Sequence, residues 1–272
     1  MKRGPSPNIH HPSSHHSMPG HRFYLPPEAC RDNTLSLTGR EAHHALRVLR
    51  VQRGEQVVVL DGAGLECRCE VQDCGRNAVA LKVVEKRSTV PLPCQLTLLQ
   101  ALPKGKLIES IIQKATELGV HRIVPLLAER VVAHIEDEAA EEKSEKWQLV
   151  AIEAIKQCGS AWLPRVEAPV TPQEYLARQE NFDLALVGSL QPGSKHPREY
   201  FQRFQHEQGR RPGSVAVWIG PEGDFSPAEL RMIEAAGALP ITLGRLVLRT
   251  ETAAIYCLSI LNYELQAGEM AE

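Results

Sequence analysis

Two short blocks in the last third of the chain hold the residue types best suited to chemistry. One runs from Val217 to Pro227 and reads VWIGPEGDFSP, and the other runs from Leu243 to Ala253 and reads LGRLVLRTETA. In both, apolar residues lead into glycines, which let a backbone approach a ligand closely or adopt positive φ. Loops that follow strands are where open α/β sheets bind ligands. The blocks therefore predict the two halves of one small-molecule pocket.

Helix starts are expected to hold both blocks in place. In the first, Ser226 is placed to act as N-cap, Pro227 to occupy the first helical position and Glu229 to complete a capping box. In the second, a strand over 239–243 leads through a loop into a helix over about 250–266.

The chain upstream of these blocks is expected to supply a sheet. After the proline-bounded hinge at 90–93, buried-type strands alternate with longer helices, a pattern typical of a mainly parallel sheet. We expect strands over 96–102, 121–127, 183–187 and 215–219, and helices over 107–118 and 141–157.

Residues 21–90 differ, because they contain one helix among short β-prone runs. Thr38 and Glu41 predict a capping box for a helix over 39–50. The strands expected over 56–60, 66–72 and 78–84 outline a small β-barrel. Four arginines of this part could contact phosphates or could only keep the surface solvated, and the sequence leaves both open: Arg22, Arg47, Arg50 and Arg53.

Length and composition exclude several classes of protein. With 272 residues, of which 43% are apolar, the chain can bury two ordinary cores. No apolar run is long enough to span a bilayer and no signal-peptide core is visible, which predicts a cytoplasmic protein without a membrane partner. Seven cysteines without a Cys-x-x-Cys pair predict reduced thiols and no metal site. Cys67 and Cys69 are expected to fill one face of a strand.

The formal net charge of −2 conceals an asymmetry along the chain. Residues 1–90 hold 13 Lys and Arg against 9 Asp and Glu, whereas residues 91–272 hold 18 against 24. This balance favours an anion-facing N-terminal module, with ordinary solvated surface as an equal alternative. Residues 1–20 are rich in Pro, Ser, Gly and His and are expected to form a disordered extension. The sequence contains no dinucleotide fingerprint, phosphate-binding loop, zinc-protease motif or nucleophile elbow.

The two blocks also resemble a known family. IGPEG at 219–223 and LRTETA at 248–253 are preceded by PKG at 103–105, QKATELGV at 113–120 and PLLAER at 125–130. This set is similar to the motifs of the RsmE family, bacterial enzymes of the SPOUT superfamily that methylate N3 of a uridine in small-subunit (16S) ribosomal RNA. The match runs in consistent order from His21 to the C-terminus and includes HHALRVLR at 43–50.

The resemblance implies a fold and a set of partners. It implies α/β architecture: a PUA-like RNA-binding β-barrel over 21–90, followed over 91–272 by a SPOUT-type α/β-knot methyltransferase domain with a parallel sheet. It further implies S-adenosylmethionine as methyl donor, small-subunit ribosomal RNA as substrate and a homodimer. The chain departs from many relatives at Asp224, where they have Gly, and at Ser160, where they have Arg.

Individual residues follow from the same resemblance. RNA contacts are expected at Arg22, Arg47 and Arg50, because of their residue type and not because of the resemblance, and at Lys104. Donor contacts are expected around Leu186, Val187, Gly188, Ile219, Gly220, Pro221, Glu222, Gly223, Leu243, Gly244, Leu246 and Leu248. The glycines and apolar side chains among them suit an adenine ring, which needs apolar walls and close backbone.

Methylation of uracil N3 sets two tasks for the remaining groups. The base must be aligned with the donor, and the N3 proton must be removed. Glu251 and Glu222 are the candidate carboxylates, and Arg249 is the candidate that stabilises charge on the uracil oxygens or anchors a phosphate. Glu251 could equally serve as an acid in the first turn of its helix. A SPOUT enzyme for ribose 2'-hydroxyls and a non-catalytic RNA-binding ribosome assembly factor stay open as alternatives.

Overall fold

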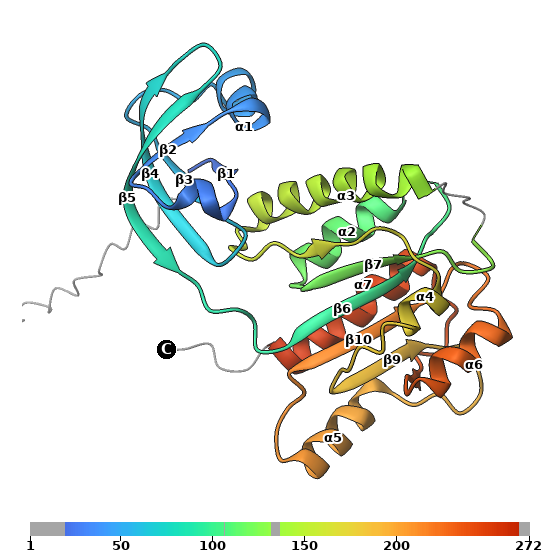
Figure 1. The fold of residues 1–272 in the computed structure, drawn as a ribbon. Helices are drawn as coiled ribbons and strands as arrows, with labels where there is room; N and C mark the ends of the chain where they lie inside the picture. Colours follow the sequence, from blue (N-terminus) through green and yellow to red (C-terminus); the bar gives the residue numbers. More distant parts are fainter. Residues whose placement is uncertain (1–19, 106, 132–136, 267–272) are drawn as a thin grey trace, which may run out of the picture.

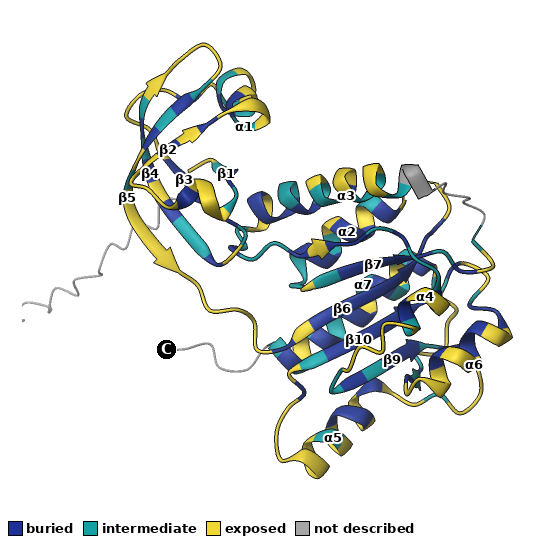
Figure 2. Ribbon diagram, in the orientation of Figure 1, coloured by how far each residue is buried: buried dark blue, intermediate teal, exposed yellow. Residues whose placement is uncertain are grey.

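The computed structural model describes residues 20–105, 107–131 and 137–266 as two joined domains, each built on its own β-sheet (Figure 1). Apart from Gly20, the extension expected over 1–20 lies outside the described residues. Buried residues concentrate within the two sheets and on the helix sides that face them, as Figure 2 shows. No helix of the described ranges is long and apolar enough to cross a membrane.

The N-terminal sheet has five strands in the order β1-β3-β4-β5-β2. Their bounds are β1 Arg22–Tyr24, β2 Thr34–Leu37, β3 Gln56–Leu60, β4 Leu65–Cys74 and β5 Val79–Ser88. β1 and β3 run parallel, and the other neighbours are antiparallel. Cys67, Cys69 and Val71 alternate into the core of this domain, which confirms that the two cysteines fill one face of a strand.

The helical segment expected over 39–50 is present, but it is less regular than the sequence predicts. α1 covers only Gly39–His43, a π-helical turn covers His44–Leu49, and Arg50 ends it in the left-handed region at φ 55°. The predicted capping box was wrong, because the side chain of Thr38 makes no cap hydrogen bond. Glu41 instead accepts hydrogen bonds from the backbone N–H of Tyr24 at 3.2 Å and from Lys156 Nζ at 2.9 Å.

The second sheet has six strands, all parallel to their neighbours, in the order β11-β9-β10-β6-β7-β8. Their bounds are β6 Gln95–Ala101, β7 Arg122–Leu126, β8 Arg165–Val166, β9 Leu184–Gly188, β10 Ser214–Ile219 and β11 Leu239–Ile241. The parallel sheet expected from the alternation of strands and helices is confirmed.

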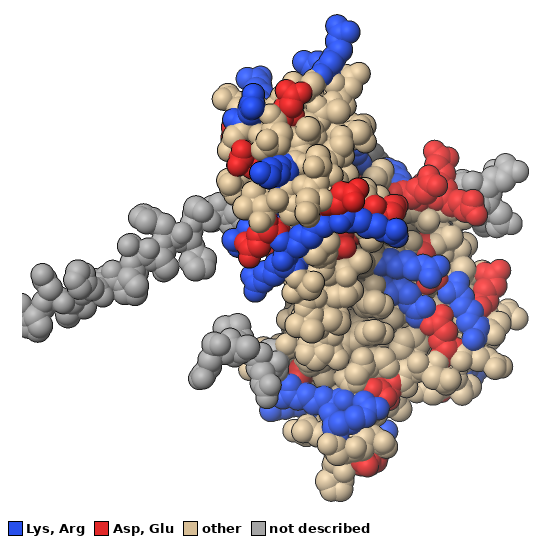
Figure 3. All heavy atoms as spheres, turned by 60° about the vertical axis from the view of Figure 1, so that its left-hand side comes forward, with Lys and Arg blue, Asp and Glu red and all other residues tan. Residues whose placement is uncertain are grey.

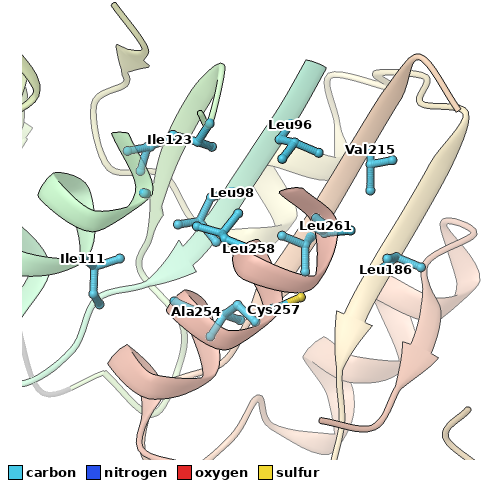
Figure 4. Packing of buried hydrophobic residues seen from close by; sticks show 14 of the residues in the cluster. Leu96, Leu98, Ile111, Ile123, Leu186, Val215, Ala254, Cys257, Leu258 and Leu261 are labelled. Carbon is cyan, nitrogen blue, oxygen red and sulfur yellow. The ribbon is translucent and has the colours of Figure 1, made fainter. Parts of the chain in front are cut away.

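Helices cover both faces of this sheet. They are α2 Leu107–Glu117, α3 Asp137–Cys158, α4 Pro172–Leu176, α5 Pro197–Gln208, α6 Pro227–Ala235 and α7 Thr250–Leu261, which continues as a π-helical turn over Asn262–Gln266. One face packs on α2, α3, α5 and α7, with Leu98 and Leu258 near the centre of the cluster (Figure 4). The other face packs on α4 and α6 around Trp218 and Phe225. Parallel strands buried on both faces explain the nearly continuous apolar runs of the sequence.

The last helix returns from the edge of the sheet to its centre. β11 is an edge strand, yet α7 contacts α2, β6 and β10. The loop after β11 therefore crosses the carboxyl ends of β9 and β10, where it meets the loop that follows β10. The trefoil knot implied by the resemblance stays a prediction.

The two domains are joined by backbone pairing and by a buried ion pair. In the turn between β3 and β4, the N–H of Gly64 donates to the carbonyl of Ala161, and the carbonyl of Gly62 accepts from the N–H of Leu163, both at 2.9 Å. Gly64 has φ +101°, and a Cβ there would lie 2.5 Å from the ring of Trp162, so only glycine fits. Lys156 of α3 forms the ion pair with Glu41 of α1.

Candidate active site

Three strand ends enclose a cavity of about 340 Å³ at the carboxyl edge of the parallel sheet. β9, β10 and the segment after β11 each contribute one wall. The lining residues are Gly188, Ser189, Leu190, Gln191, Ser194, Ile219, Gly220, Pro221, Glu222, Asp224, Thr242, Leu243, Gly244, Arg245, Leu246, Val247, Leu248, Thr250 and Ala253. The prediction that the two sequence blocks meet in one pocket is confirmed.

The wall after β10 is a tight turn followed by a capped helix. The N–H of Asp224 donates to the carbonyl of Pro221 at 2.9 Å, and Asp224 itself adopts φ 61°. Its Oδ1 accepts from the N–H of Phe225 at 2.8 Å, which offsets part of the cost of a left-handed conformation for a residue with a side chain. Ser226 and Glu229 then form the predicted capping box of α6, which is confirmed.

Residues outside the two blocks hold this turn in place. The backbone N–H of Lys104 donates to Glu222 Oε1 at 3.1 Å, and the guanidinium of Arg130 donates to the carbonyl of Gly223. Buried Glu229 accepts a further hydrogen bond from the N–H of Glu129 at 2.8 Å. The PKG and PLLAER motifs of the sequence thus support the first loop.

The wall after β11 is a wide loop with an apolar rim. Gly244 has φ +119°, and the Oγ1 of Thr242 lies 3.2 Å from both the N and the O of that glycine. Leu246 and Val247 are 78% and 77% exposed although both line the cavity. An exposed apolar rim of this kind is suited to a flat aromatic ligand or to a second protein surface.

Predicted and observed lining residues overlap without coinciding. Gly188, the 219–222 segment, Leu243, Gly244, Leu246 and Leu248 line the cavity. Leu186 and Val187 do not, because both are fully buried in the cores on the two faces of β9, and Gly223 lies outside the lining. Sequence reasoning missed Ser189, Gln191, Ser194 and Thr242, polar residues just beyond strand ends, a position that could have indicated them.

The candidate catalytic residues lie at the start of α7 and in the turn after β10. Arg249 is the exposed N-cap residue of α7 and makes no side-chain cap hydrogen bond, and Glu251 is half-buried in the first turn. Glu222 is exposed and is held by Lys104. Burial raises the pKa of Cys257, one turn beyond the lining residue Ala253, to about 12, so this thiol stays protonated and does not act as a nucleophile.

The basic residues expected to bind RNA fall in separate places. Arg47 and Arg50 are exposed together on the N-terminal domain, and Lys104 is exposed beside the pocket. Arg22 instead packs over Gly159 and donates to the carbonyls of Lys156 and Gln157 at the end of α3. This contact joins the two domains and explains the position of the Arg22 side chain without a contact to RNA. Figure 3 shows Lys and Arg gathered in a band where the domains meet, with acidic groups beside it.

No metal site accompanies the pocket among the residues that the structure describes. Those ranges contain no group of three or more His, Cys, Asp or Glu side chains arranged to hold an ion.

Comparison with known proteins matches both domains. The family described as RNA methyltransferase domain matches residues 90–262, and the family described as RNA methyltransferase PUA domain matches residues 37–84. Ribosomal RNA small subunit methyltransferase E of Bacillus subtilis is 33% identical over 86% of this chain and 91% of its own length. The chain belongs to the RsmE family.

Solved structures of methyltransferases have the same architecture. A methyltransferase from Legionella pneumophila with bound S-adenosylmethionine is 33% identical and superposes with a TM-score of 0.81 over 90% of this chain and 97% of that one. Ribosomal RNA small subunit methyltransferase E from Neisseria gonorrhoeae, also bound to S-adenosylmethionine, is 26% identical, with a TM-score of 0.79 over the same shares. The family and the PUA-like and parallel-sheet domains expected from the sequence motifs are confirmed.

Proposed function

We propose that this protein transfers the methyl group of S-adenosylmethionine to N3 of a uridine in small-subunit (16S) ribosomal RNA. The observation that carries the proposal is the meeting of the two family motif blocks around one cavity at the carboxyl edge of the sheet. Membership of the family indicates which reaction to expect, and the cavity offers a site where the methyl donor can bind.

The cavity suits the methyl donor in size and in chemistry. Its volume of about 340 Å³ falls within the usual range for small-molecule sites, roughly 300–1,000 Å³. Ile219, Leu243 and Leu248 offer apolar walls for an adenine ring, and Ser189, Gln191 and Thr242 offer polar groups for the ribose and the amino acid part. When bound, S-adenosylmethionine supplies a methyl carbon activated by a positively charged sulfur.

The start of α7 supplies the groups for the acceptor. Arg249 is exposed next to the lining residue Thr250 and carries no ion pair within the described ranges, so its charge is available to uracil oxygens or to a phosphate. Glu251, half-buried in the same turn, takes the N3 proton. Glu222 has a supporting role, because its carboxylate fixes the backbone at Lys104.

The N-terminal domain, residues 21–90, binds the RNA. Arg47 and Arg50 present guanidinium groups without competing salt bridges in the described structure, and Lys104, at a separate place, adds a positive charge beside the mouth of the pocket. Two copies of the chain pair through the outer side of α7 and the π-helical turn that follows it, where Tyr256 and Tyr263 are exposed aromatic residues. The enzyme acts in the cytoplasm, where small subunits are assembled.

Nucleoside mass spectrometry of 16S ribosomal RNA tests the proposal. Cells that lack the gene are expected to lose one N3-methyluridine, and the intact gene should restore it. Loss of a 2'-O-methyl nucleoside would support the alternative SPOUT activity instead. Calorimetry with purified protein should detect binding of S-adenosylmethionine; absence of binding would favour a non-catalytic assembly factor.

A further inference from the structure

A buried amide on β6 connects the two loops of the pocket. Gln100 is fully buried, and its Nε2 donates a hydrogen bond to Oγ1 of Thr250 at 3.0 Å. Thr250 Oγ1 in turn donates to the carbonyl oxygen of Gly220 at 2.7 Å. Gln100 itself does not line the cavity, and in the sequence it lies within a run expected to be an apolar strand.

The connection lies where both loops leave regular structure. Gln100 pairs in register with Ile219, the last residue of β10, so the amide stands beside the point where the first loop begins. Thr250 is the first residue of α7, so its hydroxyl stands where the second loop ends. The side chain of Gln100 thus reaches the second loop at Thr250, and the hydroxyl of Thr250 reaches the first loop at Gly220.

The available protons fix the direction of this chain of hydrogen bonds. A threonine hydroxyl carries a single proton, which Thr250 gives to Gly220. The oxygen of Thr250 must therefore receive a donor from Gln100, and only the Nε2 side of the amide can provide one. The other Nε2 proton goes to the carbonyl of Ala101 at 2.9 Å. Both donors of the amide are used, and its orientation is set.

We propose that Gln100 is a positioning residue: acting through Thr250, it holds the Gly220 peptide and the start of α7 in the arrangement that binds the methyl donor. The inference rests on the proposed function, because it takes S-adenosylmethionine as the ligand. A pocket whose loops are already fixed loses less conformational freedom when the ligand binds, and so binds more tightly.

The amide also carries an energetic cost in the core. Gln100 Oε1 is buried and has no hydrogen-bond partner among the described residues, and a buried unsatisfied acceptor disfavours folding. An apolar side chain of similar size would remove that cost. A residue that carries this cost in the core, and that orients the hydroxyl joining two loops of a binding site, is better explained by its effect on the site.

The first test replaces the amide by Gln100→Leu. We expect the Kd for S-adenosylmethionine, measured by calorimetry, and the KM for the donor to rise about fivefold, the effect of one lost hydrogen bond. The melting temperature should change no more than in the control Thr97→Val, a buried substitution on the same strand that does not touch the pocket.

The second test uses the hydroxyl, and it decides the matter if Gln100→Leu fails to fold. Thr250→Val keeps the shape of the side chain but removes both hydrogen bonds, and we expect the same rise in Kd and KM. Thr250→Ser keeps the hydroxyl and should restore most of the wild-type affinity. The double variant Gln100→Leu/Thr250→Val should lose no more affinity than the worse single variant, because both act through one chain.

The inference and the proposed function can fail separately. Wild-type protein that does not bind S-adenosylmethionine would overturn both. Wild-type protein that binds and methylates, together with Gln100→Leu and Thr250→Val variants of unchanged Kd and KM, would overturn the positioning role alone. Failure of Thr250→Ser to restore affinity would also count against it, since the hydroxyl would then not be the group that matters.

Discussion

Lys156 of α3 and Glu41 of α1 form an ion pair across the domain junction, with Nζ and Oε1 2.9 Å apart. Their side chains are only 6% and 12% exposed. Lys156 also contacts Glu153 at 3.0 Å, and Glu153 in turn contacts Arg40 of the N-terminal domain at 3.2 Å. The junction therefore contains a small network of alternating charges, with its most buried member on the methyltransferase side.

Removing the cation from this network should destabilise the protein strongly. We expect Lys156→Met to lower the free energy of unfolding by about 3 kcal/mol, because it leaves Glu41 buried without its partner. Lys146→Met is the matched control: Lys146 lies on the same helix and pairs with Glu109 at 2.7 Å, but it is exposed, and such pairs contribute about 0–1 kcal/mol. Urea denaturation of both variants would measure the difference. An equal decrease in the free energy of unfolding for both variants would show that burial of the junction pair does not increase its contribution to stability.

The left-handed residue in the first pocket loop leads to a second prediction. Asp224→Ala removes the hydrogen bond to Phe225 and keeps a Cβ at φ 61°, so we expect a loss of about 1–2 kcal/mol. Asp224→Gly also loses the bond but relieves the backbone, and its stability should stay within about 0.5 kcal/mol of wild type. Thermal unfolding of the two variants checks the order. An alanine variant as stable as the glycine variant would contradict the argument.

Arg249 is expected to act in methylation and not in folding. Its side chain is exposed and makes no cap hydrogen bond, so Arg249→Ala should change the free energy of unfolding by less than about 0.5 kcal/mol while it abolishes turnover on ribosomal subunits. Arg231→Ala on α6 is the control for loss of an exposed arginine. Full turnover by the Arg249 variant would remove this residue from the mechanism.

A substitution at Glu251 distinguishes a catalytic role of this residue from a structural one. If it takes the N3 proton, Glu251→Gln should lose turnover by about 10²-fold or more with little change in donor affinity. If it only stabilises the N-terminus of α7, the same variant should keep its turnover and lose roughly 0.5 kcal/mol of stability. We expect the first result. Single-turnover kinetics beside a thermal melt distinguishes the two in one preparation.

Arg47 and Arg50 are predicted to contact RNA phosphates. The double variant Arg47→Ala/Arg50→Ala should bind ribosomal RNA more weakly and should reduce the slope of log affinity against log salt concentration by about 1.5. Arg203→Ala/Arg231→Ala, on α5 and α6 of the other domain, controls for the general loss of positive charge. An unchanged slope in the first variant would reassign both arginines to the solvated surface.

Much of the second domain could be predicted from the sequence, because its strands are buried on both faces. The run from Gln95 to Ala101 lacks the alternation of a half-buried strand, which is typical of a strand buried on both faces. Local chemistry marks the helix ends: Gly119 follows the end of α2, and the Ser226 capping box begins α6. The strand order could not be predicted, because which strands become neighbours depends on connections that leave no local pattern.

The failures have a common cause in contacts between distant segments. Thr38 and Glu41 have the spacing of a capping box, but the carboxylate of Glu41 pairs instead with Lys156, more than a hundred residues later in the sequence. Arg22 has the chemistry of a phosphate contact, but it binds the end of α3. The role proposed for Gln100 could not be predicted from the sequence, because it depends on hydrogen bonds that link Gln100 to Thr250 and Thr250 to Gly220, residues far away in the sequence.

The position of the segment that leads into α7 also sets the order in which the pocket is assembled during synthesis. One wall of the pocket and the hydroxyl that joins its loops come from residues 242–253, which follow all six strands of the parallel sheet in the sequence. A nascent polypeptide that has already formed its N-terminal sheet and the six strands of the parallel sheet still lacks this wall of the pocket. The pocket can therefore bind the methyl donor only after the 242–253 segment has been synthesised and has packed across the carboxyl ends of β9 and β10.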